Sequence, residues 1–200
     1  MGIPVMVLGE SGSGKSSSLR NFDINEVGIF NVASKPLPFR KKLQKIDKAT
    51  YATIKAGLAK PVFKKYVIDD SQYLMAFEMF DKAKITGYGK FTDMAVNFKE
   101  LIDFVINNTP DDLVVYFLHH VQSDEFGTRA KTVGKMLDNQ LTVEGLFSIV
   151  LKTKVGGGEY KFVTQTDGND TVKSPMGMFE REIDNDLKFV DEQIREYWDL

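Results

Sequence analysis

Gly9-Glu10-Ser11-Gly12-Ser13-Gly14-Lys15-Ser16 is the stretch from which the fold is most directly predicted. It has the pattern G-x-x-x-x-G-K-[ST], follows an apolar run and precedes a segment for which we predict a helix. Glycines let backbone N–H groups turn inward around phosphate oxygens, and the start of a helix adds partial positive charge. The stretch therefore predicts a phosphate-binding loop whose nucleotide contacts are Gly9, Glu10, Ser11, Gly12, Ser13, Gly14, Lys15, Ser16 and Ser17.

Another predicted strand ends with two adjacent carboxylates, Asp69 and Asp70. In loops of this type the lysine, here Lys15, contacts the β- and γ-phosphates, and the hydroxyl that follows it binds Mg²⁺. An aspartate at a strand end completes such a site, so we predict ATP with Mg²⁺ as cofactor and Ser16 and Asp69 as metal ligands. Asp70 is the candidate group for activating water. The alternative is that both carboxylates only cap the helix predicted near Ser71.

Two histidines, His119 and His120, follow the strongly apolar predicted strand 113–118. A polar group at the tip of a strand beside the magnesium carboxylate can contact the γ-phosphate or the attacking water. We predict His119, or alternatively His120, as this catalytic sensor; a surface pair without a role is the competing interpretation. A metal site built on both is disfavoured, because successive side chains of a strand point to opposite faces.

Lys152 and Lys154 end a further predicted strand and lie on the same face of it, because side chains alternate. We predict them as catalytic basic fingers that reach the γ-phosphate of a neighbouring subunit and stabilise its charge. Arg129, Lys131 and Lys135, in a polar loop predicted at 123–139, are rival fingers or DNA contacts. For each of these side chains, an ordinary surface role is the alternative.

The overall pattern indicates a single domain, 1–200, of the α/β class. Short apolar runs alternate with amphipathic segments, and Gly156-Gly157-Gly158 between two strand-like runs is a hairpin signal. We expect a mostly parallel sheet, flanked by helices, with an antiparallel C-terminal hairpin. The predicted strands are 3–8, 28–33, 62–69, 113–118, 145–154 and 160–165; the predicted helices are 15–22, 71–84, 91–107 and 187–198, and 39–58 is expected to be partly helical.

Composition and charge limit the possible functions. The 200-residue chain has no cysteine, which excludes disulfides, thiolate metal sites and a cysteine nucleophile. No apolar run approaches the roughly 20 residues that cross a bilayer, so we expect a cytoplasmic protein without a membrane partner. The net charge of −2 argues against generic nucleic-acid binding, yet residues 35–65 contain ten Lys/Arg and one acid, Asp47. This basic segment is either a solvated surface or a contact for a phosphate backbone.

The order of these motifs resembles the minimal core of RecA-like ATPases. The tail Lys173–Phe179 followed by Ile183–Leu187 is similar to that of bacteriophage-encoded AAA/RecA-like ATPases, which include core-only RecA relatives of the single-strand-annealing type. The resemblance covers nearly the whole chain. It implies a RecA-like P-loop NTPase fold, ATP hydrolysis, single-stranded DNA and single-strand-binding protein as partners, and a homo-oligomeric ring or filament with ATP between subunits.

The chain departs from this family at the strand that follows the loop helix. RecA-like recombinases usually end that strand with a catalytic glutamate, whereas this chain continues as Asn31-Val32-Ala33-Ser34-Lys35, without an acid. Nucleotide binding is therefore better supported than rapid hydrolysis.

Three functions are compatible with these motifs. The first is a DNA-dependent ATPase of phage recombination or replication, which also accounts for the basic segment. The second is a nucleotide-gated loader or mediator that hydrolyses slowly, which the missing glutamate keeps open. The third is a small-molecule kinase, such as a nucleotide kinase; it is disfavoured because such enzymes usually carry an arginine-rich lid. The five arginines of this chain are scattered singly, at Arg20, Arg40, Arg129, Arg181 and Arg195.

Overall fold

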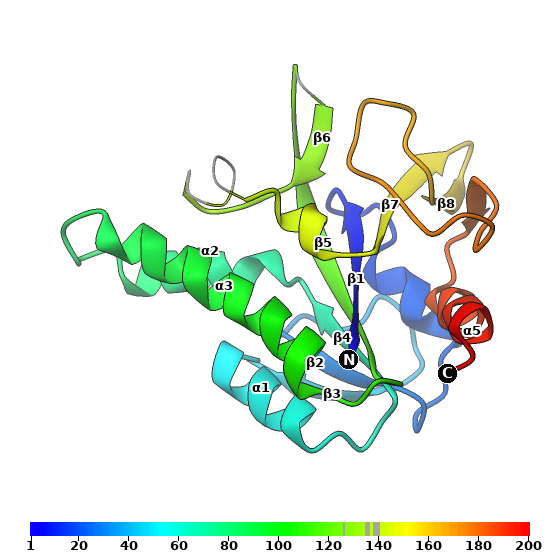
Figure 1. Ribbon diagram of the computed structural model, residues 1–200, viewed down its shortest axis with the longest axis horizontal. Helices are drawn as coiled ribbons and strands as arrows, with labels where there is room; N and C mark the ends of the chain where they lie inside the picture. The colour runs from blue at the N-terminus through cyan, green and yellow to red at the C-terminus, as the bar shows by residue number, and fades with distance from the viewer. Residues whose placement is uncertain (126, 135–136, 138–140) are drawn as a thin grey trace.

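A mixed sheet runs through the middle of the molecule, with helices on both of its faces (Figure 1). The structure is a computed structural model that describes residues 1–125, 127–134, 137 and 141–200. Neighbouring strands follow the order β3-β2-β4-β5-β1-β7-β8-β9, and β6 pairs with β5. The predicted α/β class, with a mostly parallel sheet flanked by helices, is confirmed. The strands are β1 (Ile3–Gly9), β2 (Gly28–Asn31), β3 (Gln44–Asp47), β4 (Lys65–Asp69), β5 (Val114–Asp124), β6 (Gly127–Ala130), β7 (Ile149–Gly156), β8 (Glu159–Val163) and β9 (Glu182–Asp184).

The strands from β3 to β7 along this order are parallel, and β1 lies between β5 and β7. The register places Val7 beside Leu118 on one side and beside Leu151 on the other. A strand in the middle of a parallel sheet is covered on both faces, which is why β1 is a continuous apolar run rather than an alternating one. Its carboxyl end therefore delivers Gly9 to the same edge of the sheet as the ends of β4 and β5.

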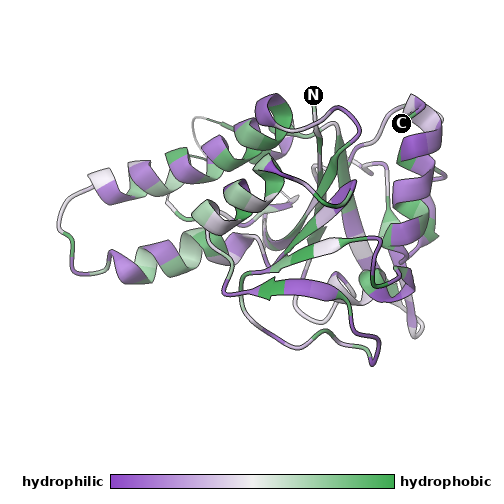
Figure 2. Cartoon of the chain, turned by 90° about the horizontal axis from the view of Figure 1, so that it is seen from below, coloured by the Kyte–Doolittle hydropathy of each residue, from purple (hydrophilic) through white to green (hydrophobic). Residues whose placement is uncertain are grey.

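The helices form two layers of different composition. One face of the sheet is covered by α1 (Tyr51–Ala59), α2 (Gln72–Asp81) and α3 (Gly89–Asn108), and α2 and α3 extend together beyond the sheet (Figure 1). The other face is covered by the 3-10 helix η1 (Ser16–Asn21) and by α5 (Leu187–Trp198). Figure 2 shows apolar strands in the interior and a largely hydrophilic α5 at the side. Alternation in β1 sends Met6 and Leu8 into the first core and Val5 and Val7 into the second.

Several elements differ from the prediction. The segment predicted to be partly helical contains the edge strand β3, whose residues are all exposed and so lack the apolar signal of a buried strand. α1 begins only after it, where Thr50 and Thr53 form a reciprocal capping box. β6 lies in the stretch predicted as a polar loop. The strand predicted from 145 begins at Ile149, because a second 3-10 helix, η2 (Val143–Leu146), precedes it.

The C-terminal part of the sheet turns antiparallel. The predicted hairpin is present: β7 and β8 pair antiparallel with Lys154 opposite Lys161, and β9, which was not predicted, adds a further antiparallel strand. The C-terminal helix occupies the predicted residues, with the Asp186 side chain accepting from the N–H groups of Lys188 and Phe189. In the part of the chain that the structure describes, no helix has the length and apolar character needed to cross a membrane.

Candidate functional site

A cavity of about 220 Å³ opens where β1, β4 and β5 end. In open α/β sheets, ligands bind outside the carboxyl ends of parallel strands, which is where this cavity lies. It brings together the loop after β1, the two carboxylates after β4, one histidine of β5 and a proline-containing segment after β2. Its lining residues are Ser11, Gly12, Gly14, Lys15, Ser16, Ser17, Lys35, Pro36, Pro38, Asp69, Asp70 and His120.

The loop between β1 and η1 has the backbone that its glycines predict. Gly12 and Gly14 have φ angles of 78° and 98°, in the region that side-chain-bearing residues avoid. Gly9 is needed for a different reason, since a Cβ there would lie 2.1 Å from Oγ1 of Thr153. The Ser13 hydroxyl donates to the Glu10 carbonyl oxygen at 2.7 Å and accepts from the Thr153 hydroxyl at 2.7 Å. Thr153 of β7 therefore holds the loop in place through its hydrogen bond to Ser13.

Lys15 is folded back into the loop. Its ammonium donates to the carbonyl oxygens of Gly9 (2.8 Å) and Glu10 (2.9 Å), and the residue is 5% exposed. Burial lowers the pKa of Lys15 to about 8, while the nearby carboxylates of Asp70 and Asp69 act in the opposite direction. The Lys15 ammonium therefore lies in the cavity wall, where it is hydrogen-bonded to neutral carbonyl groups and not to a carboxylate.

Ser16 and Asp69 are in direct contact, although 53 positions separate them in the sequence. The Ser16 hydroxyl donates to Oδ1 of Asp69 at 2.8 Å. Burial raises the pKa of Asp69, and the hydrogen bond from Ser16 partly offsets this. A hydroxyl and a carboxylate are hard oxygen ligands that suit Mg²⁺, which usually takes its other ligands from phosphate and water. In the described residues there is no cluster of three or more His, Cys, Asp or Glu that could hold a metal.

Asp70 has a positive φ angle, and two side chains donate hydrogen bonds to its carboxylate. Its φ angle is 60°, which is strained for a residue other than glycine. Its carboxylate accepts from Nζ of Lys35 at 2.8 Å and from Nε2 of His120 at 3.1 Å. Burial alone would raise the pKa of Asp70, but the hydrogen bonds from His120 and Lys35 outweigh it and leave the pKa below its usual value. Lys35 was not among the residues predicted for the site.

The two histidines point to opposite faces of β5, as alternation requires. His119 is fully buried, with Nδ1 2.9 Å from the Ser71 hydroxyl and Nε2 2.9 Å from the Lys131 carbonyl oxygen. Burial lowers the pKa of His119 to about 4, so the ring is neutral and its Nε2 donates to that carbonyl. His120 lines the cavity instead. Of the two candidates, His120 therefore lies in the cavity wall and His119 is packed inside the protein, and the sensor role stays a prediction.

Lys152 and Lys154 lie outside the cavity lining. Lys152 pairs with Asp170 and Lys154 with Glu182, both within the chain. The residue between them, Thr153, points the other way and contacts the loop through Ser13. Reaching a neighbouring subunit would require each lysine to leave its carboxylate, so the finger assignment stays a prediction.

The rival fingers are also placed by the structure, with one exception. Arg129 pairs with Asp124 at 2.7 Å, and the Lys131 carbonyl accepts from His119. Lys135 lies outside the described residues. Neither of the two described residues lines the cavity at the loop.

Two residues behind the loop were not identified from the sequence. A Cβ on Gly14 would lie 2.8 Å from Cδ1 of Tyr160 in β8 and 3.3 Å from the amide of Asn185. Asn185 in turn accepts from Arg20 of η1 through its backbone oxygen. The C-terminal strands therefore pack directly against the loop. No local sequence signal marks these contacts, because they depend on the antiparallel addition of β8 and β9.

The basic segment 35–65 is spread over several elements rather than gathered on one helix. Five of its lysines have acidic partners in other parts of the chain: Lys35, Lys41, Lys55, Lys64 and Lys65. Lys45 pairs with Asp47 of the same strand. Within the described residues, no acidic partner is found for Arg40, Lys42, Lys48 and Lys60. The positive charge available to an outside partner is therefore smaller than the sequence count suggests.

Chemically, the arrangement offers a loop with two glycines of positive φ, a buried ammonium and two carboxylates around one open cavity. These groups suit a polyphosphate with a divalent cation. Neither a protein-family model nor a curated protein matches the chain. Any functional assignment therefore depends on the geometry of this site.

Proposed function

We propose that the chain is a P-loop ATPase of the RecA-like class, which binds ATP with Mg²⁺ at the loop Gly9–Ser16. The observation that carries this proposal is the contact between Ser16 and Asp69 beside the ammonium of Lys15. The strand order supports the class, because β5 lies between β1, which carries the loop, and β4, which carries Asp69.

The site suggests how the chain's own residues divide the work. Backbone N–H groups of the loop and Lys15 hold the phosphates, and Ser16 and Asp69 hold the cation. Mg²⁺ bound there supplies positive charge that neutralises the charge developing on the phosphates. Asp70 and His120, which are joined by a hydrogen bond, are the polar groups of the cavity best placed to orient the attacking water.

Hydrolysis by an isolated chain is expected to be slow. The strand after the loop ends at Asn31, whose amide donates to the Lys35 carbonyl and to Asp47, so no acid is supplied from there. Asp70 is engaged by Lys35 and His120. These contacts favour the second candidate, a nucleotide-gated loader or mediator, unless a neighbouring subunit in a ring or filament completes the site. Lys152 and Lys154 are the residues proposed for that completion.

Single-stranded DNA is the proposed partner, in the setting of phage recombination or replication in the host cytoplasm. Its support is the exposed basic group Arg40, Lys42, Lys48 and Lys60, together with the resemblance. Charge of this kind contacts phosphates without reading bases, so binding should weaken steeply as salt rises. The same resemblance supports single-strand-binding protein as a second proposed partner.

The decisive experiment measures ATP binding by calorimetry and turnover by phosphate release, for the wild type and for Lys15→Ala. We expect Lys15→Ala to weaken ATP binding by about 100-fold or to abolish it, because it removes a charged phosphate contact from a buried site. Lys42→Ala, an exposed lysine outside the cavity, is the matched control and should bind ATP normally. Full ATP affinity in Lys15→Ala would refute the assignment.

The DNA-dependent function is tested separately from binding. Turnover should rise when single-stranded DNA is added at low salt, and this rise should shrink as salt increases. Turnover that ignores DNA at low salt would leave the slow nucleotide-gated module as the better assignment. A phosphorylated small-molecule product would show a kinase instead.

A further inference from the structure

The segment after β2 places a second lysine, Lys35, in the wall of the cavity that holds Lys15. We propose that Lys35 recognises the terminal phosphate of the nucleotide, and that it does so by exchanging its carboxylate partner, Asp70, for that phosphate. This inference rests on the proposed nucleotide-binding function and names the part of the triphosphate that the second lysine reads. It assigns a discriminating role, triphosphate against diphosphate, to a residue of the same chain.

Position is the first argument. The strands β2, β4, β5 and β1 are neighbours in that order, and each contributes a polar group to the cavity from its carboxyl end or just beyond it. Lys15 follows β1, and Lys35 follows β2 at the opposite side of the set. Asp69, the magnesium carboxylate in the proposed function, ends β4 between them. The two lysines therefore face the cation site from different sides, Lys15 from the loop and Lys35 from beyond it.

The bonding state of the two lysines is the second argument. Lys15 donates to two neutral carbonyl oxygens and is buried, whereas the Lys35 side chain is 57% exposed and pairs with a carboxylate. The Lys35 end of this pair is open to solvent, so its ammonium can move to another anion, whereas Asp70, whose side chain is 9% exposed, stays in place and keeps the hydrogen bond from His120. Phosphate offers the same charge-assisted hydrogen bond that the carboxylate gives. The ammonium is thus available for exchange without disturbing the fold.

Charge balance in the cavity supports the exchange. The two lysines are matched by the two carboxylates, Asp69 and Asp70, so an incoming polyphosphate meets acidic groups as well as basic ones. If Lys35 moved to the phosphate, Asp70 would keep its hydrogen bond from His120 at 3.1 Å. The carboxylate would then be free of its cation at the moment when the terminal phosphate is present. Release of Asp70 is therefore linked to the arrival of a triphosphate.

The surroundings of Lys35 guide its ammonium. It lies 4.9 Å from the centre of the Tyr73 ring, and that ring also meets His120 edge-on at 5.4 Å. A cation over an aromatic face keeps a favourable contact while its hydrogen-bond partner changes. Tyr73 is stacked on Phe77 of the same helix, α2, which holds the ring in place. The Tyr73 ring therefore keeps its contact with the Lys35 ammonium while that ammonium changes its hydrogen-bond partner.

The test compares a non-hydrolysable ATP analogue with ADP, both with Mg²⁺, by calorimetry on the full chain. In Lys35→Met, which keeps the length of the side chain without its charge, we expect analogue binding to weaken about 10-fold or more and ADP binding less than about 3-fold. Lys35→Arg should recover part of the analogue affinity. Lys99→Met, which removes an exposed lysine that pairs with Asp103 outside the cavity and the basic segment, should change neither. Thermal unfolding without nucleotide checks that each variant folds.

A second variant tests the exchange itself. Asp70→Asn removes the competing charge, so analogue binding should stay equal to wild type or become tighter. Equal loss of analogue and ADP in Lys35→Met, loss of neither, or weaker analogue binding in Asp70→Asn would each overturn the inference while leaving nucleotide binding intact. A wild-type chain that binds neither nucleotide would overturn the proposed function first, and this inference with it.

Discussion

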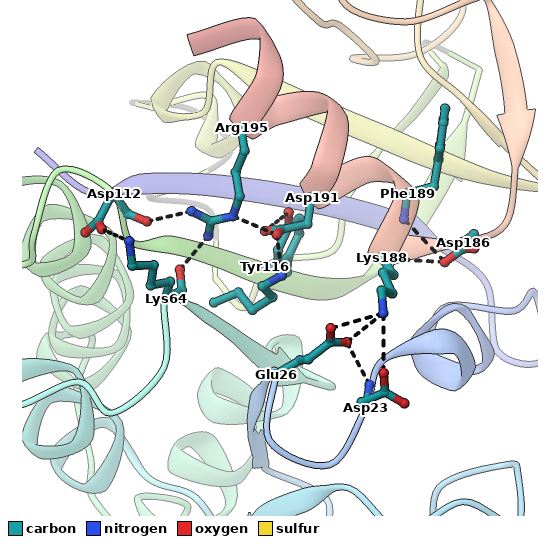
Figure 3. Close-up of polar contacts among 11 residues, drawn as sticks. Asp23, Glu26, Lys64, Asp112, Tyr116, Asp186, Lys188, Phe189, Asp191 and Arg195 are labelled. Atoms are coloured by element: carbon teal, nitrogen blue, oxygen red, sulfur yellow. Dashed lines mark hydrogen bonds and ion pairs between the residues drawn. The ribbon is translucent and has the colours of Figure 1, made fainter. Parts of the chain in front are cut away.

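The two faces of the sheet are covered by helices in different ways. The face under α1, α2 and α3 is closed by apolar and aromatic side chains, with Phe98 of α3 packed edge-on against Phe117 at 6.3 Å between ring centres. The face under α5 has an apolar core too, but α5 is also tied to the sheet by charged groups (Figure 3). The carboxylate of Asp191 lies at the centre of this group of charged and polar contacts.

Asp191 is completely buried and accepts from three directions. The Tyr116 hydroxyl donates to it at 2.9 Å, Lys65 pairs with it at 2.7 Å and Nε of Arg195 donates to it at 2.8 Å. Burial raises the pKa of the Tyr116 hydroxyl well above its usual value, with the charge of Asp191 adding to the effect. Arg195 continues to the backbone oxygens of Asp112 and Lys64. Fully paired charge therefore adds to apolar contact in docking a short polar helix.

The largest effect is expected on the apolar face, from Phe98→Ala. Removing a fully buried ring leaves a cavity that the packed neighbours cannot fill, and we expect a loss of about 4 kcal/mol in the free energy of unfolding. Urea denaturation measures it. A loss below about 1 kcal/mol would show that this face is loosely packed, contrary to the comparison.

Asp191→Ala should come next, with a loss of about 3 kcal/mol, because it leaves Lys65 and Arg195 without their buried partner. The loss should change little with added salt, since the pair is shielded from solvent. Lys188→Ala is the matched control on the same helix: its partners Glu26 and Asp23 are near the surface, and its loss should stay below about 1 kcal/mol. Equal losses in the two variants would remove the distinction between docking by buried charge and ordinary surface pairing.

The smallest effect concerns the one histidine within the apolar face. The folded pKa of His119, about 4, lies below the unfolded value of 6.5, so the unfolded chain binds the proton more readily. Stability is therefore lost as pH falls from 6.5 toward 4, and we expect about 2 kcal/mol of loss from this group between pH 7.5 and pH 5. In His119→Gln, the free energy of unfolding measured with urea should fall by about 2 kcal/mol less than in the wild type over this pH range. An unchanged slope would contradict the buried, neutral imidazole.

The comparison also explains what could be predicted from the sequence. Apolar periodicity marks β1, β5 and α3, because burial against a sheet leaves a local pattern. The loop Gly9–Ser16 was also predicted from a local pattern, since the positive φ angles of Gly12 and Gly14 belong to the loop itself. Asp191 and Tyr116 are 75 positions apart, and neither looks unusual in its own segment. The docking of α5 through Asp191 therefore leaves no local pattern in the sequence from which it could be predicted.

The candidate site shows the same division. Asp69 ends a recognisable strand and was predicted to share a metal ion with Ser16, and the structure shows a direct hydrogen bond between the two. Lys35 enters the cavity only because β2 pairs with β4, with Asn31 beside Asp69, and that pairing cannot be read from composition. The choice between His119 and His120 depended on which face of β5 packs against α3, where His119 contacts Phe98. Alternation shows that the two differ, but it does not show which one faces the cavity.

The central place of β1 has a consequence for how the chain is made. Ile3 pairs with Val114, and on its other side Val5 pairs with Ile149, so the strand is synthesised long before either neighbour. At roughly 5 to 20 residues per second, a ribosome needs roughly 6 to 22 s between Ile3 and Val114. Throughout that interval an apolar strand, together with the loop that follows it, has no native partner. In the nascent chain this apolar strand therefore stays unpaired until β5 has been made, which is the kind of exposed strand that favours aggregation during synthesis.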